Sequence, residues 1–336
     1  MKKHFMAFAS LFIASLALGG CGRNSGAVRL NETVHSVFYA PQYAALELGF
    51  FKDEGLDVTV TPAGGSDKSM IALLANQADI ALLGTETGIY AYNQGREDYP
   101  VAFAQLTRKA GNFLVSREDE KDFTWTDVKG KQIIGGRLGG MPEMLLEYIL
   151  VKNGVIPGED VEIINNISYD STSLAFINGV GDYTVEFEPS ATALEARGAG
   201  HVVASLGDDS GEVPYTVYMA TKDYLSKNPD IAQKFTNAVY RGQIWVDTHS
   251  SREIAEAIHP QFKENSLDEL TTMVERYKAV DSWNTDPIFP EECFTLLQDI
   301  LEQGNQLVKR VPYADMITNR YAEKAIAEKA ISTFEQ

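Results

Sequence analysis

The chain has 336 residues, of which 44% are hydrophobic, and a formal net charge of −18 at pH 7. Such an acidic surface repels nucleic acid, because phosphate binding depends on clustered lysine and arginine side chains. It also favours a soluble monomer. The length predicts two domains. The only cysteines, Cys21 and Cys293, are too few for a cysteine-based metal site.

The first residues predict export. Lys2 and Lys3 precede an apolar stretch over residues 5–18, and glycines come directly before Cys21. This is the pattern of a secretory signal, and the apolar stretch is shorter than the ~20 residues of a membrane span. The segment at residues 18–21 resembles the bacterial lipobox, which implies cleavage before Cys21 and a lipid anchor on it. We expect a signal peptide over residues 1–20, a lipidated tether over 21–28, and anchoring on the extracytoplasmic face of the cell membrane. The alternative is an ordinary signal peptide with an incidental cysteine.

Short apolar runs then alternate with helical stretches, a pattern that predicts mostly parallel sheets covered by helices. The expected strands cover residues 29–38, 58–61, 80–83, 101–106, 113–116, 132–135, 161–164, 182–187 and 201–205. The expected helices among them cover residues 41–48, 66–76 and 142–152. Gly49 stops the first of these helices, Ser66 offers a cap to the second, and Pro142 stands in the first turn of the third.

The last third is nearly all helix. The expected helices cover residues 230–247, 251–258, 267–279, 290–303 and 314–329. A helical tail cannot extend a parallel sheet, so it must pack on a lobe that is already formed. The chain crosses outward near residues 109–117 and returns near 207–221, which predicts two α/β lobes with two crossover strands. We expect the first part of lobe I over residues 29–112, lobe II over 113–214 and the completion of lobe I over 215–336.

Four segments lie where a ligand would bind, at the carboxyl ends of strands and the starts of helices. They are Phe38-Tyr39, Gly64-Gly65-Ser66, Gly84-Thr85-Glu86 and Gly139-Gly140-Met141. Each has a structural alternative, because the aromatic pair could belong to the core and the glycines could simply permit turns.

Residues 39–58 resemble the opening of the nitrate/sulfonate/taurine-type and thiamine-pyrimidine-type periplasmic binding proteins. In this segment an aromatic residue, a small residue and a proline, Tyr39-Ala40-Pro41, are followed by Gly49-Phe50-Phe51 and by Glu54-Gly55-Leu56-Asp57-Val58. Further similar segments are residues 64–66, 78–85, 128–131, 139–142, 181–183, 187–189 and 222–229. The resemblance spans about residues 28–321. It implies a periplasmic-binding-protein fold that captures a small solute, without a cofactor, for a membrane permease and its cytoplasmic ATPase.

The nature of the ligand is predicted from acids near strand ends. Glu188 directly precedes Pro189, and Glu86 follows another strand. Carboxylates accept hydrogen bonds from amino groups and aromatic side chains stack on rings, so these acids favour an aromatic heterocycle such as a thiamine-related pyrimidine. The sulfonate-binding relatives tend to carry a small residue where Glu188 stands. The alternative is a sulfonate, taurine or nitrate anion, which Arg137, Ser66 and Thr85 would suit.

The complete expected ligand-binding set is Phe38, Tyr39, Gln42, Gly65, Ser66, Thr85, Glu86, Arg137, Gly139, Gly140, Met141 and Glu188. The fold that the resemblance implies also serves an enzyme that makes the thiamine pyrimidine. That enzyme carries a cysteine-rich motif and an active-site histidine. This sequence has no cysteine cluster, and His35 stands alone near the first expected strand's end. We therefore expect a binding protein and not an enzyme.

Overall fold

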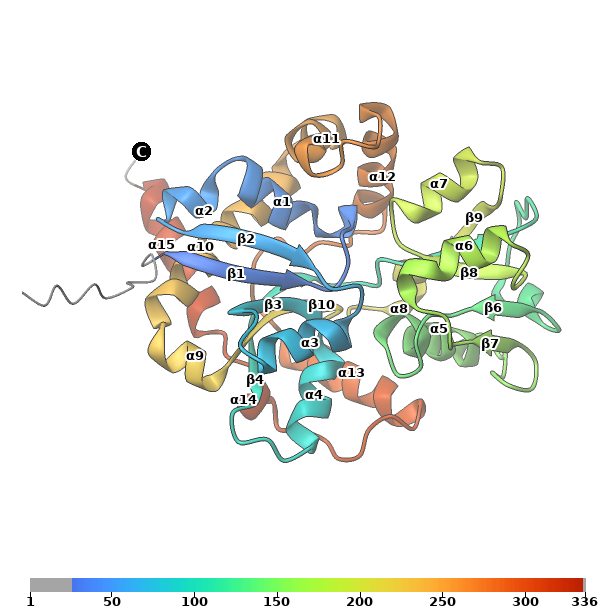
Figure 1. The fold of residues 1–336 in the computed structure, drawn as a ribbon, viewed down its shortest axis with the longest axis horizontal. Coiled ribbons are helices and arrows are strands. Elements are labelled where there is room, and N and C mark those ends of the chain that lie inside the picture. Colours follow the sequence, from blue (N-terminus) through green and yellow to red (C-terminus); the bar gives the residue numbers. More distant parts are fainter. Residues whose placement is uncertain (1–25, 335–336) are drawn as a thin grey trace, which may run out of the picture.

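Two five-stranded sheets, one in each lobe, form the frame of the computed structural model, which describes residues 26–334 (Figure 1). The first lobe contains the sheet β2-β1-β3-β10-β4, and the second lobe the sheet β7-β6-β8-β5-β9. The strands of the first sheet are β1 (Ala27–Glu32), β2 (Asp57–Pro62), β3 (Ile80–Gly84), β4 (Pro100–Thr107) and β10 (Thr216–Thr221). Those of the second are β5 (Phe113–Ser116), β6 (Gln132–Ile134), β7 (Glu162–Ile164), β8 (Tyr183–Glu186) and β9 (His201–Ser205).

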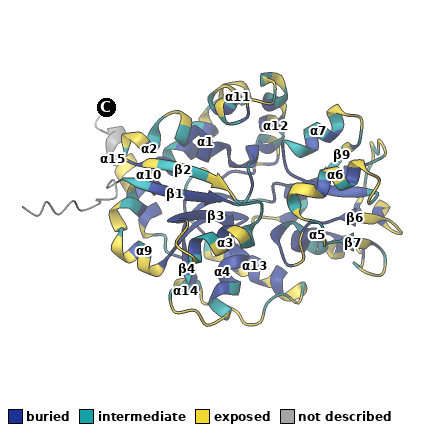
Figure 2. Cartoon of the chain, viewed as in Figure 1, coloured by how far each residue is buried: buried dark blue, intermediate teal, exposed yellow. Residues whose placement is uncertain are grey.

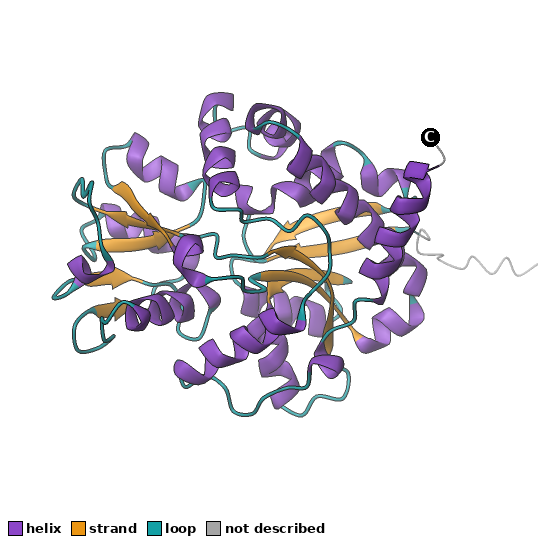
Figure 3. Ribbon diagram, turned by 180° about the vertical axis from the view of Figure 1, so that it is seen from behind, coloured by secondary structure: helices purple, strands orange, loops and turns teal. Residues whose placement is uncertain are grey.

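Each sheet is mixed, and its antiparallel strand comes from the crossing between the lobes. β10 enters the first sheet after the second crossing and is antiparallel to β3 and β4. β5 enters the second sheet after the first crossing and is antiparallel to β8 and β9. The remaining pairs are parallel. The crossing segments are visible from behind in Figure 3, and the two-lobe α/β fold with two crossings and a helical C-terminal part is confirmed.

Helices cover both sheets, and Figure 2 shows the buried residues concentrated along the sheets and on the inner faces of these helices. The first lobe has η1 (Val37–Tyr39), α1 (Ala40–Glu47), α2 (Phe50–Asp53), α3 (Ser66–Leu74), α4 (Thr85–Asn93), α9 (Lys222–Lys227), α10 (Pro229–Thr248), α11 (Ser251–Ile258), η4 (His259–Gln261), α12 (Leu267–Ala279), α13 (Glu291–Gln303), α14 (Tyr313–Met316) and α15 (Arg320–Phe334). The second has η2 (Trp125–Val128), α5 (Met141–Lys152), η3 (Tyr169–Ser171), α6 (Thr172–Ile177), α7 (Ser190–Ala196) and α8 (Leu206–Ser210). No helix among residues 26–334 is both long enough and apolar enough to span a membrane.

Most of the C-terminal helices pack on the first lobe. α10 buries Phe235, Val239 and Val246, a spacing that places an apolar stripe on one face. Gly242 lies on the same helix where it meets α1, and a Cβ there would overlap the carbonyl oxygen of Pro41. The missing side chain therefore allows the two helices to approach closely.

The first strand is shorter than predicted. The sequence predicts an extended run over residues 29–38, but β1 ends at Glu32 and residues 37–39 form η1. Ser36 caps this turn, because its hydroxyl accepts a hydrogen bond from the backbone N–H of Phe38 at 3.2 Å. Phe38 and Tyr39 therefore lie on a helical turn and are both buried, instead of alternating across a strand.

The return crossing contains the strand β10, in agreement with the prediction of two crossover strands, although no bounds are predicted for it. Two other expectations need correction. The expected helix over residues 314–329 is two helices, because the backbone N–H of Thr318 donates to Ala102 and draws the chain onto β4. Ser66 is the first residue of α3 and not its cap, since Gly65 holds the cap position and the Ser66 hydroxyl accepts from the Gly84 N–H at 3.1 Å.

Candidate functional site

A cavity lies between the two lobes at the carboxyl ends of their parallel strands. It encloses about 510 Å³ of space outside the protein atoms, the open mouth included. The expected site residues that line it are Tyr39, Gly65, Ser66, Glu86, Arg137, Gly140 and Met141.

Aromatic rings form much of the cavity wall. Tyr39 comes from η1 and Tyr169 from η3, while Phe187 follows β8 and Tyr215 precedes β10. The Phe187 ring lies 5.3 Å from that of Tyr169 and 6.1 Å from that of Tyr215, both edge to face. Rings held in this way offer faces on which a planar ligand can stack. The expected site residues do not include Tyr169, Phe187 or Tyr215, although Phe187 belongs to a segment that carries the family resemblance.

Charged groups are scarce at the cavity. Among the described residues that line it, Glu86 is the only acid and Arg137 the only base. Arg137 comes from the second lobe and lies 3.5 Å from Asp67 of the first, with both side chains partly exposed. Nearby, the Tyr90 hydroxyl of α4 donates to the carbonyl of Gly139 in the second lobe at 3.0 Å. Polar contacts between the lobes thus border the cavity.

Glu86 is the most unusual group at the site. Its side chain is fully buried, and neither carboxylate oxygen has a hydrogen-bond partner among the residues that the structure describes. Burial raises the pKa of the Glu86 carboxyl from its ordinary 4.5 to about 7, although Arg137 and the backbone N–H groups of Glu86 and Met141 act in the opposite direction. An unpaired buried carboxylate costs free energy, so this group is ready to accept hydrogen bonds from a ligand.

Several expected site residues do not line the cavity. Phe38 lies behind its wall, packed on Tyr39, with ring centroids 5.6 Å apart. The Gln42 side-chain amide donates to Glu32 at 2.7 Å, and the Thr85 hydroxyl donates to the carbonyl of Pro214 at 2.6 Å. These side chains support the cavity from outside it.

Gly139 also lies outside the cavity, in a hollow at its rim shared with Leu138 and Val308. The backbone N–H of Gly139 donates to the Glu143 carboxylate at 3.0 Å. This bond holds the loop that leads into α5, so Gly139 helps to place Gly140 and Met141 at the cavity.

Glu188 does not reach the cavity in the structure, because a partner in the first lobe engages it. Its carboxylate accepts hydrogen bonds from the Arg276 guanidinium of α12 at 2.7 Å and from the Thr192 N–H of α7 at 2.9 Å. The sequence predicts that a ligand donates to Glu188, but in the structure Arg276 and Thr192 of the protein itself donate to it. Arg276 also pairs with Glu195 of α7. Arg276 of the first lobe therefore connects it to two acids of the second lobe, close to the crossing segments.

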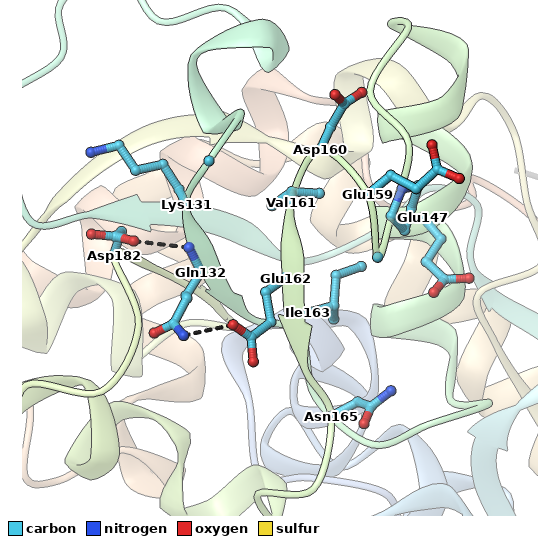
Figure 4. A pocket seen from close by; sticks show the side chains of 13 residues that line it. Lys131, Gln132, Glu147, Glu159, Asp160, Val161, Glu162, Ile163, Asn165 and Asp182 are labelled. Carbon is cyan, nitrogen blue, oxygen red and sulfur yellow. Dashed lines mark hydrogen bonds between the residues drawn. The ribbon is translucent and has the colours of Figure 1, made fainter.

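A second, wider hollow lies away from the cleft, on the outer edge of the second lobe along β6 and β7 (Figure 4). Two hydrogen bonds join residues of its lining, since the Gln132 side-chain amide donates to Glu162 at 2.7 Å and the Gln132 backbone N–H donates to Asp182 at 2.8 Å. The hollow belongs to one lobe and is open to solvent, so lobe closure cannot enclose a ligand there. The cavity between the lobes is therefore the better candidate site. No group of acidic, histidine and cysteine side chains within residues 26–334 is arranged to hold a metal ion.

Known structures share this architecture. The alkanesulfonate-binding protein SsuA from Xanthomonas axonopodis pv. citri, bound to MOPS, superposes with a TM-score of 0.68 at 18% identity, over 88% of this chain and 98% of that chain. The periplasmic nitrate-binding protein NrtA from Synechocystis PCC 6803 superposes with a TM-score of 0.70 at 16% identity, over 90% of this chain and 88% of that chain. At these identities the likeness concerns the fold.

The two α/β lobes and the cavity between them have the fold of these periplasmic binding proteins. Residues 37–251 match the model of the family described as NMT1/THI5 like. A Bacillus subtilis (strain 168) protein named "Putative binding protein YtlA" is 45% identical over 331 residues, which cover 98% of this chain and 99% of that protein. The chain belongs to the NMT1/THI5 like family.

The buried Glu86 carboxyl predicts a pH-dependent stability. Between about pH 4.5 and 7 the folded protein holds a proton that the unfolded chain has lost, so Glu86 lowers the free energy of unfolding as pH rises through this window. The full effect corresponds to roughly 3 kcal/mol above pH 7. Glu86→Gln cannot titrate. Denaturant unfolding of both proteins at pH 5 and pH 8 should show Glu86→Gln gaining stability relative to wild type at the higher pH. An equal difference at both pH values would contradict the burial of this charge.

The arginine between the lobes predicts the effect of a second substitution. Arg276→Gln leaves the fully buried Glu188 without its cation, so we expect the free energy of unfolding to fall by about 3 kcal/mol. The radius of gyration of the ligand-free protein, measured by small-angle scattering, should rise because a link between the lobes is lost. Arg310→Gln is the matched control, since Arg310 pairs with Asp299 and Glu302 within the first lobe. The same radius for wild type and Arg276→Gln would mean that this pair does not hold the lobes together.

Proposed function

We propose that this protein is an extracytoplasmic, lipid-anchored lipoprotein that captures a small aromatic heterocycle, such as a thiamine-related pyrimidine, and delivers it to an ABC import permease. The observation that carries the proposal is the aromatic wall of the cavity together with the unpaired Glu86 carboxylate. The protein would act as a monomer, without a cofactor and without catalysing a reaction.

The proposed ligand complements the cavity in two ways. A flat ring can stack on Tyr39, Tyr169, Phe187 or Tyr215. An exocyclic amino group or ring N–H can donate to Glu86, and a hydrogen bond to a charged group contributes about 1.5–3 kcal/mol. Because the cavity has walls from both lobes, such a ligand would favour the closed arrangement over an open one. Closure of this kind is the signal that we expect the permease and its ATPase partner to receive.

A small anion is the second candidate ligand. Arg137 at the cavity and the starts of α3, α4 and α5 favour a sulfonate or nitrate. The folds of the alkanesulfonate-binding and nitrate-binding proteins named above are similar to this one. The buried Glu86 carboxylate opposes such a ligand, because two like charges would then lie close together away from water.

A ligand screen with two matched variants tests the proposal. Thermal shift of the wild-type protein against pyrimidines, thiamine, riboflavin, sulfonates and inorganic anions identifies the ligand class. A ligand at 100 times its Kd stabilises the protein by ~2.7 kcal/mol. For an amino-bearing heterocycle, Glu86→Gln should weaken binding by about tenfold or more in calorimetric titration. Glu186→Gln should leave affinity unchanged. Glu186 is also a buried acid with a pKa raised to about 7, but it lies on β8 and does not line the cavity.

The outcome separates the two ligand classes. Weaker heterocycle binding in Glu86→Gln, with unchanged binding in Glu186→Gln, supports the proposal. A wild-type protein that binds sulfonates or nitrate and no heterocycle would overturn it. Equal losses in Glu86→Gln and Glu186→Gln would point to a general effect of removing buried charge and would contradict a direct role for Glu86.

The proposed anchor rests on Cys21, which lies outside the described residues. Cys21→Ala removes the thiol that a diacylglyceryl group needs, so the chain should move from the membrane to the soluble fraction when cells are fractionated. Cys293→Ala is the control, because Cys293 is buried in α13 and should not affect fractionation. Retention of Cys21→Ala in the membrane fraction would contradict the lipid anchor.

A further inference from the structure

Three helices begin at the cavity between the lobes. Gly65, Gly84 and Gly140 hold the cap positions of α3, α4 and α5, and all three glycines line the cavity. None of these helices has a side-chain cap. The first N–H groups of a helix lack acceptors within the helix, and they carry its positive dipole end. Helix starts that meet in this way form a place suited to an anion.

The carboxylate of Glu86 lies at this place. Glu86 is the second residue of α4, and its side chain folds back over Gly84, where a Cβ would overlap both carboxylate oxygens. The N–H of Met141, the first residue of α5, lowers the pKa of the Glu86 carboxyl, as does Arg137. The negative charge of Glu86 therefore lies near the starts of one helix from each lobe.

Glu86 is not an ordinary helix cap. A capping carboxylate accepts a hydrogen bond from an N–H in the first turn of the helix that it caps, as Glu188 does from Thr192 in the first turn of α7. The backbone N–H groups of Glu86 and Met141 lie near enough to the Glu86 carboxylate to lower its pKa, but neither oxygen has a hydrogen bond of normal geometry from a residue that the structure describes. The side chain is fully buried and lines the cavity. Above pH 7, where this carboxyl is mostly ionised, its negative charge lies at the ligand space with unused acceptor capacity.

We propose that Glu86 is a built-in anion that fills the anion-binding place between the starts of α4 and α5, and thereby determines ligand class. It excludes sulfonates, nitrate and other small anions, and it selects ligands that donate hydrogen bonds. This inference rests on the proposed function in that it assigns ligand binding to the same cavity. Exclusion follows because a second negative charge beside a buried carboxylate is strongly unfavourable in a site shielded from water.

Calorimetric titration of methanesulfonate and of nitrate at pH 8, above the pKa of about 7 of the Glu86 carboxyl, tests this role. The wild-type protein should bind neither anion measurably. Glu86→Gln removes the charge and keeps the shape, so we expect it to gain anion affinity by about tenfold or more. Glu86→Ser also frees the space that the carboxylate fills, and should gain at least as much. Glu186→Gln, which removes a buried carboxylate away from the cavity, should gain nothing.

Each outcome decides the inference. Binding of either anion to wild type as tightly as to the variants would overturn it, and so would the absence of a gain in the folded Glu86 variants. If Glu86→Ser does not fold, as judged by circular dichroism, the nearly isosteric Glu86→Gln decides alone. The proposed function is tested separately by heterocycle binding. If no heterocycle binds but the Glu86 variants gain anion affinity, the exclusion role holds and the proposed function fails. If a heterocycle binds but the variants gain no anion affinity, only the exclusion role fails.

Discussion

The free-energy cost of removing carboxylates from water shapes the interior of this protein. Glu32, Glu86 and Glu188 are all fully buried, and each must find donors or remain costly. Glu32 accepts a hydrogen bond from Gln42, and Glu188 is paired with Arg276. Glu86 has no such partner among the described residues, and it is the one of the three that lines the cavity between the lobes. The protein thus satisfies the acids that hold its structure and leaves one available where a ligand can reach it.

The topology explains why so many polar features meet at one cavity. The parallel strands of each sheet run toward the crossings, so their carboxyl ends and the helices that follow face the other lobe. α3 and α4 begin there in the first lobe, and α5 begins there in the second. The strands β5 and β10 are antiparallel to their neighbours because each follows a crossing between the lobes. Tyr215, which lines the cavity, directly precedes β10.

The parts of the fold that could be predicted from the sequence are those that local signals determine. α11 and α12 have the predicted bounds because each begins at a capping box, with Ser250 bonded to Glu253 and Ser266 to Glu269. β10 and the break before α15 depend on pairing with strands far away in the chain. The contact of Thr318 with Ala102 joins segments more than two hundred residues apart. No window of the sequence around Thr318 contains that information.

Some residues of the candidate site are likewise indicated by local sequence signals, and others depend on distant parts of the chain. Glu86 and the glycines before α3 and α5 lie at strand-to-helix junctions, which a sequence shows directly, whereas Tyr169 and Tyr215 reach the cavity through a short turn and a crossing. Glu188 follows the same strand-end rule as Glu86, but Arg276, 88 residues away, reaches it across the gap between the lobes. A strand end therefore indicates where a carboxylate lies along the sheet. Whether that carboxylate binds a ligand or joins the lobes depends on the charges that the rest of the fold brings beside it.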